Sequence, residues 1–153
     1  MRTLEKISRK PKNAFVEGAI SPEFIANSIT KHQSKTTIGA HNIFLGQVRN
    51  DTKDGKTVRA IEYSCYMDMA MDVLNQIREE AFRKFNLFCV HIHHSIGTVR
   101  AGELCLFVFT SSAHRNDAYE SCRWLVEEIK NKVPIWGKEI FEDDTYQWKI
   151  NRT

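Results

Sequence analysis

The sequence predicts an α+β fold with a mainly antiparallel sheet, and two observations lead to that class. Two segments, 67–85 and about 116–131, carry apolar residues three and four positions apart, which is the spacing of an amphipathic helix. The other apolar segments are short and rich in β-forming residues. Hairpin-like connections join them, which is typical of antiparallel neighbours. At 153 residues, the chain has the length of one domain with a buried core.

A short helix is expected first, from Ser21 to about Lys35. The Ser21 side chain can cap this helix, and Pro22 suits the first turn because its missing N–H would have no partner there. Glu23 places a negative charge at the positive end of the helix dipole. Residues 1–13 are basic but contain no apolar stretch, so they are interpreted as a flexible tail and not as a secretory signal.

Strands are expected after this helix, and turn residues mark where they end. Asp54-Gly55, within the turn DTKDGK, is a hairpin signal, so the segments on its two sides are expected to pair. A turn at Ala101-Gly102 separates the next two strands. The expected strands are 36–48, 58–66, 87–97, 103–112, 135–141 and 145–150.

The two longer helices each have an apolar face, and Pro134 limits the second of them. The face of the helix at 67–85 contains Ala70, Leu74, Ile77, Ala81 and Phe85. The face of the helix at about 116–131 contains Ala118, Cys122, Leu125 and Ile129. We expect both faces to pack on the sheet, and we interpret residues 14–153 as a single domain.

Composition excludes several classes of protein. The net charge of +3 is too mild for a typical nucleic-acid-binding surface. No apolar run approaches the roughly 20 residues of a membrane span. The four cysteines form no CxxC pair and lie among apolar residues, which favours buried thiols in a reducing cytoplasm over zinc ligands. We therefore expect a cytoplasmic protein that binds neither nucleic acid nor membranes.

The histidines of the segment HIHH raise the question of a metal site. On a strand, His91 and His93 share one face and His94 points to the other. No carboxylate stands at a suitable spacing beside them. They are interpreted as packing or surface residues, and no metal is expected.

Two strand ends carry candidate anion-binding residues. In FLGQVRND, Arg49 ends a strand just after a glycine and can grip a phosphate or carboxylate; a plain surface arginine is the alternative. In TSSAHRNDAY, His114 and Arg115 open a helix whose free N–H groups attract anions. The alternative there is that polar neighbours simply cap the helix, namely Ser112, Asn116 or Asp117.

The segment KNKVPIWGKE, 130–139, supplies two lysines around a proline-stiffened turn. Lys130 follows Val126 by one helical turn, so it borders the apolar face, and partial desolvation there would lower its pKa. Lys138 follows the turn, which fixes its direction. The residues together predict a cationic pocket for a small phosphorylated or carboxylated ligand, made of Arg49, His114, Arg115, Lys130 and Lys138.

Five motifs in order resemble the large, catalytic subunit of molybdopterin synthase, namely FLGQVR, IEYSCYMDMA, HHSIG with AGE, SSAHRNDAY and IKNKVPIWGKE. The resemblance covers residues 14–150. It implies an α/β hammerhead fold, a homodimer, and a heterotetramer with a small ubiquitin-like sulfur carrier whose C-terminal Gly-Gly ends in a thiocarboxylate. The implied reaction adds two dithiolene sulfurs to cyclic pyranopterin monophosphate and gives molybdopterin, in molybdenum cofactor biosynthesis. It implies no cofactor and no metal for the enzyme itself.

The resemblance also assigns site residues. It implies that Lys130 and Lys138 are catalytic. The implied substrate-binding residues are Gln47, Val48, Arg49, His114, Arg115, Lys130, Gly137, Lys138 and Glu139. Two positions depart from the family pattern. Gly137 replaces a lysine, so that either Lys138 reaches the same place, helped by the backbone freedom of glycine, or the role of that lysine is weakened. Ser95 replaces an arginine in a turn.

Two other functions remain open from the sequence. One is a non-catalytic binding module, in which the same cationic cleft holds a phosphorylated metabolite or an acidic partner tail. The replacement of lysine by Gly137 favours it. The other is a hydrolase using His114, which lacks a nearby Ser or Cys nucleophile with a defined orienting group.

Overall fold

The computed structural model describes residues 13–150, so the expected basic tail lies almost wholly outside the described residues. The helices are α2 (Pro22–His32), α3 (Met67–Lys84) and α4 (Arg115–Lys132). The strands are β1 (Phe15–Glu17), β2 (Ala40–Gln47), β3 (Thr52–Lys53), β4 (Lys56–Cys65), β5 (Cys89–Arg100), β6 (Leu104–Ser112), β7 (Ile135–Phe141) and β8 (Tyr146–Trp148). They form one sheet in the order β2-β6-β5-β4-β7-β8, with β1 beside β5 and β3 beside β4.

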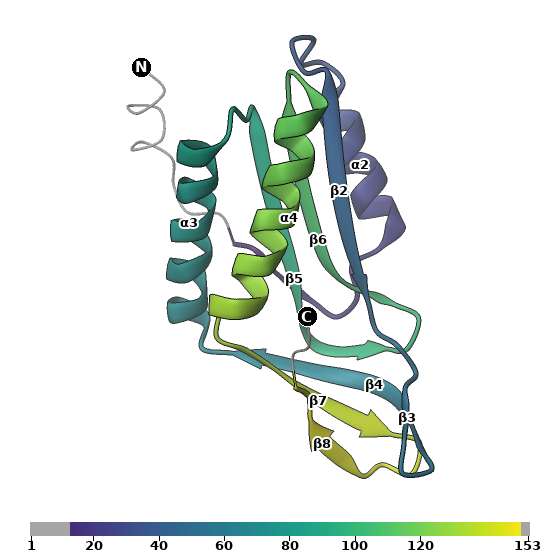
Figure 1. Cartoon of the computed structure of the whole chain (residues 1–153). Helices are drawn as coiled ribbons and strands as arrows, with labels where there is room; N and C mark the ends of the chain where they lie inside the picture. The colour runs from purple at the N-terminus through teal and green to yellow at the C-terminus, as the bar shows by residue number, and fades with distance from the viewer. Residues whose placement is uncertain (1–12, 151–153) are drawn as a thin grey trace.

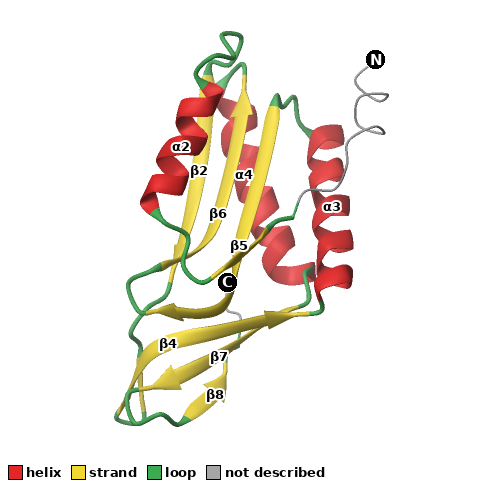
Figure 2. Cartoon of the chain, turned by 180° about the vertical axis from the view of Figure 1, so that it is seen from behind, coloured by secondary structure: helices red, strands yellow, loops and turns green. Residues whose placement is uncertain are grey.

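Strand β5 connects two parts of this sheet. Its first half, from Cys89 to His94, pairs with β6, and its second half, from Gly97 to Arg100, pairs with β4. Gly97 has a φ of +79°, and a Cβ atom there would lie 2.3 Å from a carboxylate oxygen of Glu17. The positive φ angle favours glycine at this position, whereas the Glu17 carboxylate is the end of a flexible side chain and could move aside. Figures 1 and 2 show the result: β4, β7 and β8 run across the lower end of the upright β2, β6 and β5.

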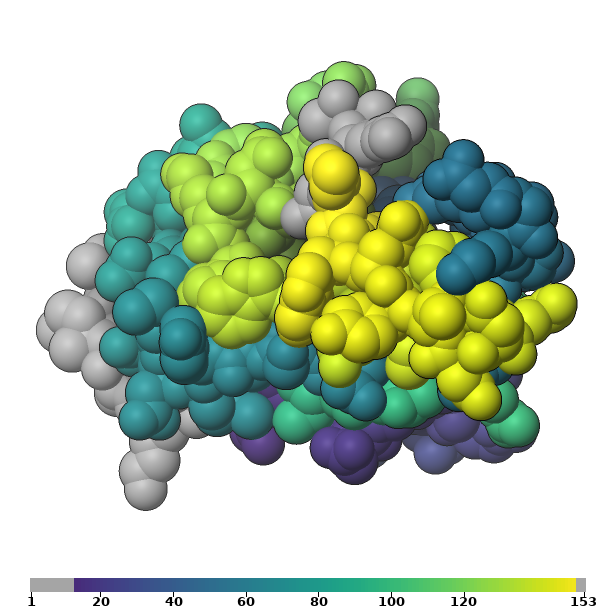
Figure 3. Space-filling view, turned by 90° about the horizontal axis from the view of Figure 1, so that it is seen from below, coloured from purple at the N-terminus to yellow at the C-terminus, as the bar shows by residue number. Residues whose placement is uncertain are grey.

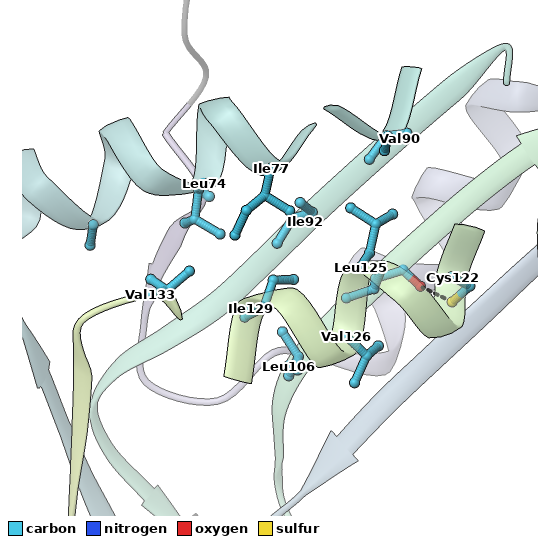
Figure 4. Packing of buried hydrophobic residues seen from close by; sticks show 14 of the residues in the cluster. Leu74, Ile77, Val90, Ile92, Leu106, Cys122, Leu125, Val126, Ile129 and Val133 are labelled. Carbon is cyan, nitrogen blue, oxygen red and sulfur yellow. Dashed lines mark hydrogen bonds between the residues drawn. The ribbon is translucent and has the colours of Figure 1, made fainter. Parts of the chain in front are cut away.

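Helices cover both faces of the upright strands. Helices α3 and α4 lie on one face, and α2 lies on the other (Figures 1 and 2). The main core fills the space between α3, α4, β5 and β6 (Figure 4). On the other face, Ile25 of α2 packs with Phe107 and Phe109 of β6. Among residues 13–150, no helix combines the length and apolar character needed to cross a membrane.

The expected fold class is confirmed. The sheet is antiparallel in every pair except β1 with β5. Ser21 caps α2 through its side chain, and Asp54 and Gly55 take the positive φ angles of a hairpin turn. The expected buried faces of the two long helices are buried, except that Phe85 lies just past α3 and is partly exposed. All four cysteines are free thiols.

Three expectations about strands were incomplete or wrong. The strand before the Asp54-Gly55 turn was expected to pair with the strand after it, but β2 pairs with β6, and only the two-residue β3 pairs with β4 across this turn. Strand β1 was not expected, because three residues carry too little periodicity to be recognised and because it pairs with β5 in parallel. Ser95 lies inside β5 and not in a turn. Its side chain is buried, and its hydroxyl has no hydrogen-bond partner among residues 13–150.

Replacing Leu125 by alanine tests the core that holds α4 in place. Leu125 is fully buried between α4 and the sheet (Figure 4). We expect the free energy of unfolding to fall by about 2–5 kcal/mol, because the lost contacts leave a cavity that packed neighbours cannot fill. Urea denaturation of wild type and variant measures this. Glu120→Ala, an exposed change on the same helix, is the control. A loss below about 1 kcal/mol would contradict the packing.

Candidate active site

Two neighbouring cavities open where α4 meets the crossing strands. The first, called the inner pocket, has a volume of about 240 Å³. The second, called the outer cleft, has a volume of about 340 Å³. Seen from below, the surface is hollowed between the yellow C-terminal residues and the blue residues around position 50, which are segments that line the outer cleft (Figure 3).

The two cavities have different linings. The inner pocket is mainly apolar and aromatic, and is lined by Tyr63, His94, Cys105, Leu106, Ile129, Lys130, Val133, Ile135, Trp136, Gly137, Trp148 and Lys149. The outer cleft is more polar, and is lined by Phe44, Leu45, Gly46, Gln47, Val48, Arg49, Asp51, Lys53, Ile61, Lys130, Glu139, Lys149 and Ile150. It contains four cationic side chains against two carboxylates, so it favours an anion.

Lys130 and Lys149 line both cavities and therefore stand between them. Lys130 lies in the last turn of α4, and Lys149 directly follows β8. Burial lowers the pKa of Lys149, and repulsion from the nearby Lys130 lowers it further. Lys130 itself is exposed, so the desolvation that the sequence predicted for Lys130 is found at Lys149 instead.

Lys149 was missed by the sequence analysis. No local motif marks it, because it reaches the site only through the pairing of the chain end with β7, where its backbone N–H donates to the Gly137 oxygen at 2.8 Å. A Cβ atom on Gly137 would lie 3.5 Å from the Lys149 Cβ and 3.0 Å from a methyl carbon of Ile61. A side chain at 137 would thus start from the same wall as Lys149.

Lys138 does not line either cavity. Successive residues of a strand point to opposite faces, so Lys138 faces away from the side that Gly137 and Glu139 occupy. Its Nζ lies 4.5 Å from the centre of the Tyr146 ring and 5.7 Å from that of Trp148. The expectation that Lys138 reaches the place of the missing lysine therefore does not match the geometry.

Glu139 faces the outer cleft and is buried. Lys53 donates to its carboxylate at 2.8 Å and Gln147 donates at 3.1 Å. Burial alone would raise the pKa of Glu139, but these two contacts outweigh it and the pKa is lowered. Glu139 thus stays ionised and fixes Lys53 at the edge of the cleft.

The end of β2 supplies the other side of the outer cleft. A Cβ atom on Gly46 would lie 3.0 Å from the Leu106 Cβ, so glycine allows β2 to approach β6 closely here. The register shifts between Gly46 and Gln47, and such a bulge changes where the following side chains point. The Val48 side chain is buried in the core. The Arg49 side chain is largely exposed and pairs with Asp51 at 3.2 Å.

His114 and Arg115 lie at the opposite end of α4 from Lys130. Fifteen residues of helix separate Arg115 from Lys130, which is about 22 Å along the axis at 1.5 Å per residue. No side chain caps this end of α4, and the Ser112 hydroxyl donates instead to the His114 carbonyl oxygen. The five-residue cationic pocket that the sequence predicted is therefore not assembled within one chain.

The inner pocket has an uncharged floor. Burial lowers the pKa of His94 to about 4, and its Nδ1 donates to the Ser95 oxygen at 2.7 Å, so the ring is neutral at pH 7. Burial, together with the neighbouring Cys105 thiol, raises the pKa of Tyr63, so its hydroxyl stays protonated. Cys105 is buried beside them. In this part of the site, the lysines between the cavities are the charged groups.

Replacing Lys138 by methionine tests whether this lysine takes part in the reaction or only packs against the Tyr146 and Trp148 rings. We expect the free energy of unfolding to fall by less than about 1 kcal/mol, the usual value of a partly exposed cation–π contact. We also expect turnover to change by less than about threefold, because the side chain lies outside both cavities. Urea denaturation and single-turnover kinetics measure these effects. A loss of most activity in a folded variant would show that Lys138 reaches the reaction after all.

Known proteins support a family assignment for this geometry. The family model for MoaE protein matches residues 19–132. A molybdopterin synthase catalytic subunit from Pyrococcus abyssi is 33% identical, with 90% of this chain and 86% of that protein covered. One from Emericella nidulans is 36% identical; 80% of this chain is covered, but the match spans only 62% of that protein's length.

A solved structure agrees with these relatives. The crystal structure of molybdopterin synthase from Staphylococcus aureus matches with a TM-score of 0.78 and 32% identity. That match covers 94% of this chain and 100% of the other. The family model, the relatives and the solved structure all indicate the same family, and each match covers most of this chain. The chain therefore belongs to the MoaE protein family, the family of molybdopterin synthase catalytic subunits.

Proposed function

We propose that the chain is the catalytic subunit of a molybdopterin synthase. It would transfer sulfur from a thiocarboxylated carrier protein to cyclic pyranopterin monophosphate and form the molybdopterin dithiolene. One observation carries the proposal: Lys130 and Lys149 stand between a mainly apolar pocket and a more polar, cationic cleft. Two reactants that enter from the two sides would meet at these lysines.

Each cavity suits one reactant. The inner pocket is bordered by Trp136 and Trp148 and has an uncharged floor, which fits a narrow peptide tail such as Gly-Gly. The outer cleft has Arg49 and Lys53 at its edge, which fit a phosphate. The thiocarboxylate at the end of the tail would then lie beside Lys130.

The chemistry needs positive charge at this point. The thiocarboxylate sulfur forms a bond to a substrate carbon while a carbon–oxygen bond at that carbon breaks, and the oxygen leaves either as water after it takes up a proton or as part of the phosphate. The product is a thioester between carrier and substrate. Water then adds to the acyl carbon, the carbon–sulfur bond breaks, and the carrier leaves as a carboxylate while the substrate keeps a thiolate. Both the tetrahedral oxyanion and the thiolate are stabilised by fixed cations. The Lys149 amine, with its lowered pKa, can also accept a proton from the attacking water.

We propose a homodimer that binds one carrier per chain, as a heterotetramer. His114 and Arg115 are exposed and lie about 22 Å along α4 from Lys130, so they serve the same site only if another copy supplies them. Strand β2 is also an edge of the sheet, with its outer side unpaired among the described strands.

Mixing two inactive variants tests this assembly. Arg115→Ala and Lys130→Ala damage different ends of the chain, so subunit exchange between the two homodimers creates one site with neither change. We expect each variant alone to be nearly inactive and the exchanged mixture to recover up to about a quarter of the wild-type rate per chain, by statistical pairing. Native mass spectrometry verifies that the subunits have exchanged. If the rate then stays at the level of the single variants, a shared site is contradicted.

The direct test of function is incubation with thiocarboxylated carrier and cyclic pyranopterin monophosphate. The expected result is dithiolene product together with carrier carboxylate, and carrier without the thiocarboxylate is the control. The rival function, a binding module, predicts substrate binding with no product. It is not favoured, because the curated relatives described above are named as catalytic subunits. We propose that residues 14–153 act as one catalytic unit in the cytoplasm, where the four free thiols stay reduced.

A further inference from the structure

Three potential metal ligands meet on the side of the sheet that α2 covers. They are His32 at the end of α2, and Cys89 and His91 at the start of β5. Their ligand atoms all lie within 4.8 Å of one another. His94, which lines the inner pocket, is five residues further along β5 than Cys89, or about 16 Å. The cluster is therefore separate from the site described above.

The hydrogen bonds of His32 put a lone pair on the nitrogen that faces the cluster, where it now meets His91 and where a metal could take the place of the shared hydrogen. His32 Nδ1 lies 2.7 Å from the Ser28 carbonyl oxygen, which can only accept, so Nδ1 carries the hydrogen. His32 Nε2 then has a lone pair, and it lies 2.9 Å from His91 Nε2. A backbone carbonyl that fixes the tautomer in this way is the usual second contact of a metal-binding histidine.

Burial and charge at Cys89 also fit a thiolate ligand. The Cys89 and His32 side chains are both buried, while His91 is partly exposed. Lys35 Nζ donates to Cys89 Sγ at 3.1 Å. A sulfur that receives a hydrogen bond from an ammonium group is well placed to carry negative charge when it binds a cation.

The distances leave room for one ion. Around tetrahedral zinc, with Zn–N of about 2.0–2.1 Å and Zn–S of about 2.3 Å, ligand atoms lie about 3.3–3.6 Å apart. The present separations, from 2.9 Å to at most 4.8 Å, lie on both sides of that range, so small side-chain rotations would suffice. Imidazole and thiolate together, without a carboxylate, favour zinc over magnesium or calcium.

We propose that His32, Cys89 and His91 bind one Zn²⁺, with water as the fourth ligand on the exposed side of His91. The ion would fasten the end of α2 to the start of β5, since His32 and His91 are 59 positions apart in the sequence. The sequence analysis considered His91 together with His93 and His94, and looked for CxxC pairs. It missed this set because one ligand comes from a distant helix.

Cobalt titration of the metal-free full-length protein tests the proposal. We expect one equivalent to bind with tetrahedral d–d bands and a thiolate-to-cobalt charge-transfer band, and zinc to displace it. Cys89→Ser should remove the charge-transfer band. His32→Ala and His91→Ala should each weaken binding by more than about 100-fold, since even losing an outer-sphere partner costs about 10–100-fold.

His93→Ala is the matched control, because His93 lies on the same face of β5 but stacks on Phe107 and meets Phe24 edge to face instead. It should keep one equivalent of cobalt. Zinc should raise the melting temperature of wild type and of His93→Ala, but not of Cys89→Ser, and circular dichroism confirms that each variant is folded. If wild type binds no stoichiometric cobalt, or if folded Cys89→Ser binds it with the wild-type spectrum, the proposal is overturned.

Discussion

Changing Lys130 to alanine is expected to lower the single-turnover rate of sulfur transfer by about 100- to 1,000-fold, the usual cost of removing one group that stabilises an oxyanion. Lys130 lines both cavities, so it lies where the carrier tail and the substrate are expected to meet. The fold should survive, because the side chain is exposed. Product formation with thiocarboxylated carrier measures the rate, and circular dichroism confirms folding.

Lys132→Ala is the matched control for this change. Lys132 lies on the same turn of α4, but it is exposed and pairs with Glu128 at 2.7 Å. Its removal should leave the rate within about twofold. Lys130→Arg then separates charge from proton transfer, since arginine keeps the charge but does not lose a proton. A Lys130→Ala protein with near wild-type rate would show that Lys130 only ends a solvated helix.

Local patterns predicted most of the fold because each was either long or, as in a turn, complete within a few residues. Helices α3 and α4 each carry an apolar face over five turns, and Asp54-Gly55 forces a turn whatever its surroundings. Strand β1 was not predicted because its three residues are stabilised by pairing with β5, far along the chain. The change of partner along β5 likewise depends on distant segments, since its first half pairs with β6 and its second half with β4.

The site was predictable only where one segment supplied it. Lys130 borders the apolar face of its own helix, and Gln47, Val48 and Arg49 end their own strand, so these residues were found, and all line the outer cleft. Grouping them with His114 and Arg115 required knowing that both ends of α4 serve one site, which a single chain does not allow.

Lys138 and Lys149 show the same limit at a finer scale. Lys138 was expected to replace the lysine missing at Gly137 because it is the next residue. On a strand, however, the next residue points to the opposite face. The residue beside Gly137 in space is Lys149, which β8 delivers by pairing with β7. Sequence adjacency therefore points to Lys138, whereas adjacency in space points to Lys149.

The lysine pair between the two cavities leads to the second large effect. Changing Lys149 to methionine keeps the length and packing of the side chain but removes its charge. We expect at least about a 100-fold loss in the rate of sulfur transfer, because the oxyanion loses one of two cations and the attacking water loses a base. Lys149→Arg should recover the part due to charge alone.

A lysine placed at 137 tests whether Lys149 does the work of the lysine that the family pattern has at that position. Gly137→Lys in an otherwise wild-type chain is expected to fold less stably, since its Cβ would lie 3.0 Å from Ile61. In the Lys149→Met background the same change should restore a measurable part of the lost rate, because the new ammonium group starts from the same wall of the inner pocket. Gly137→Met in that background adds the bulk without the charge and should restore nothing. If Lys149→Met retains the wild-type rate, the desolvated lysine is only a structural neighbour of the site, and Lys130 alone supplies the charge there.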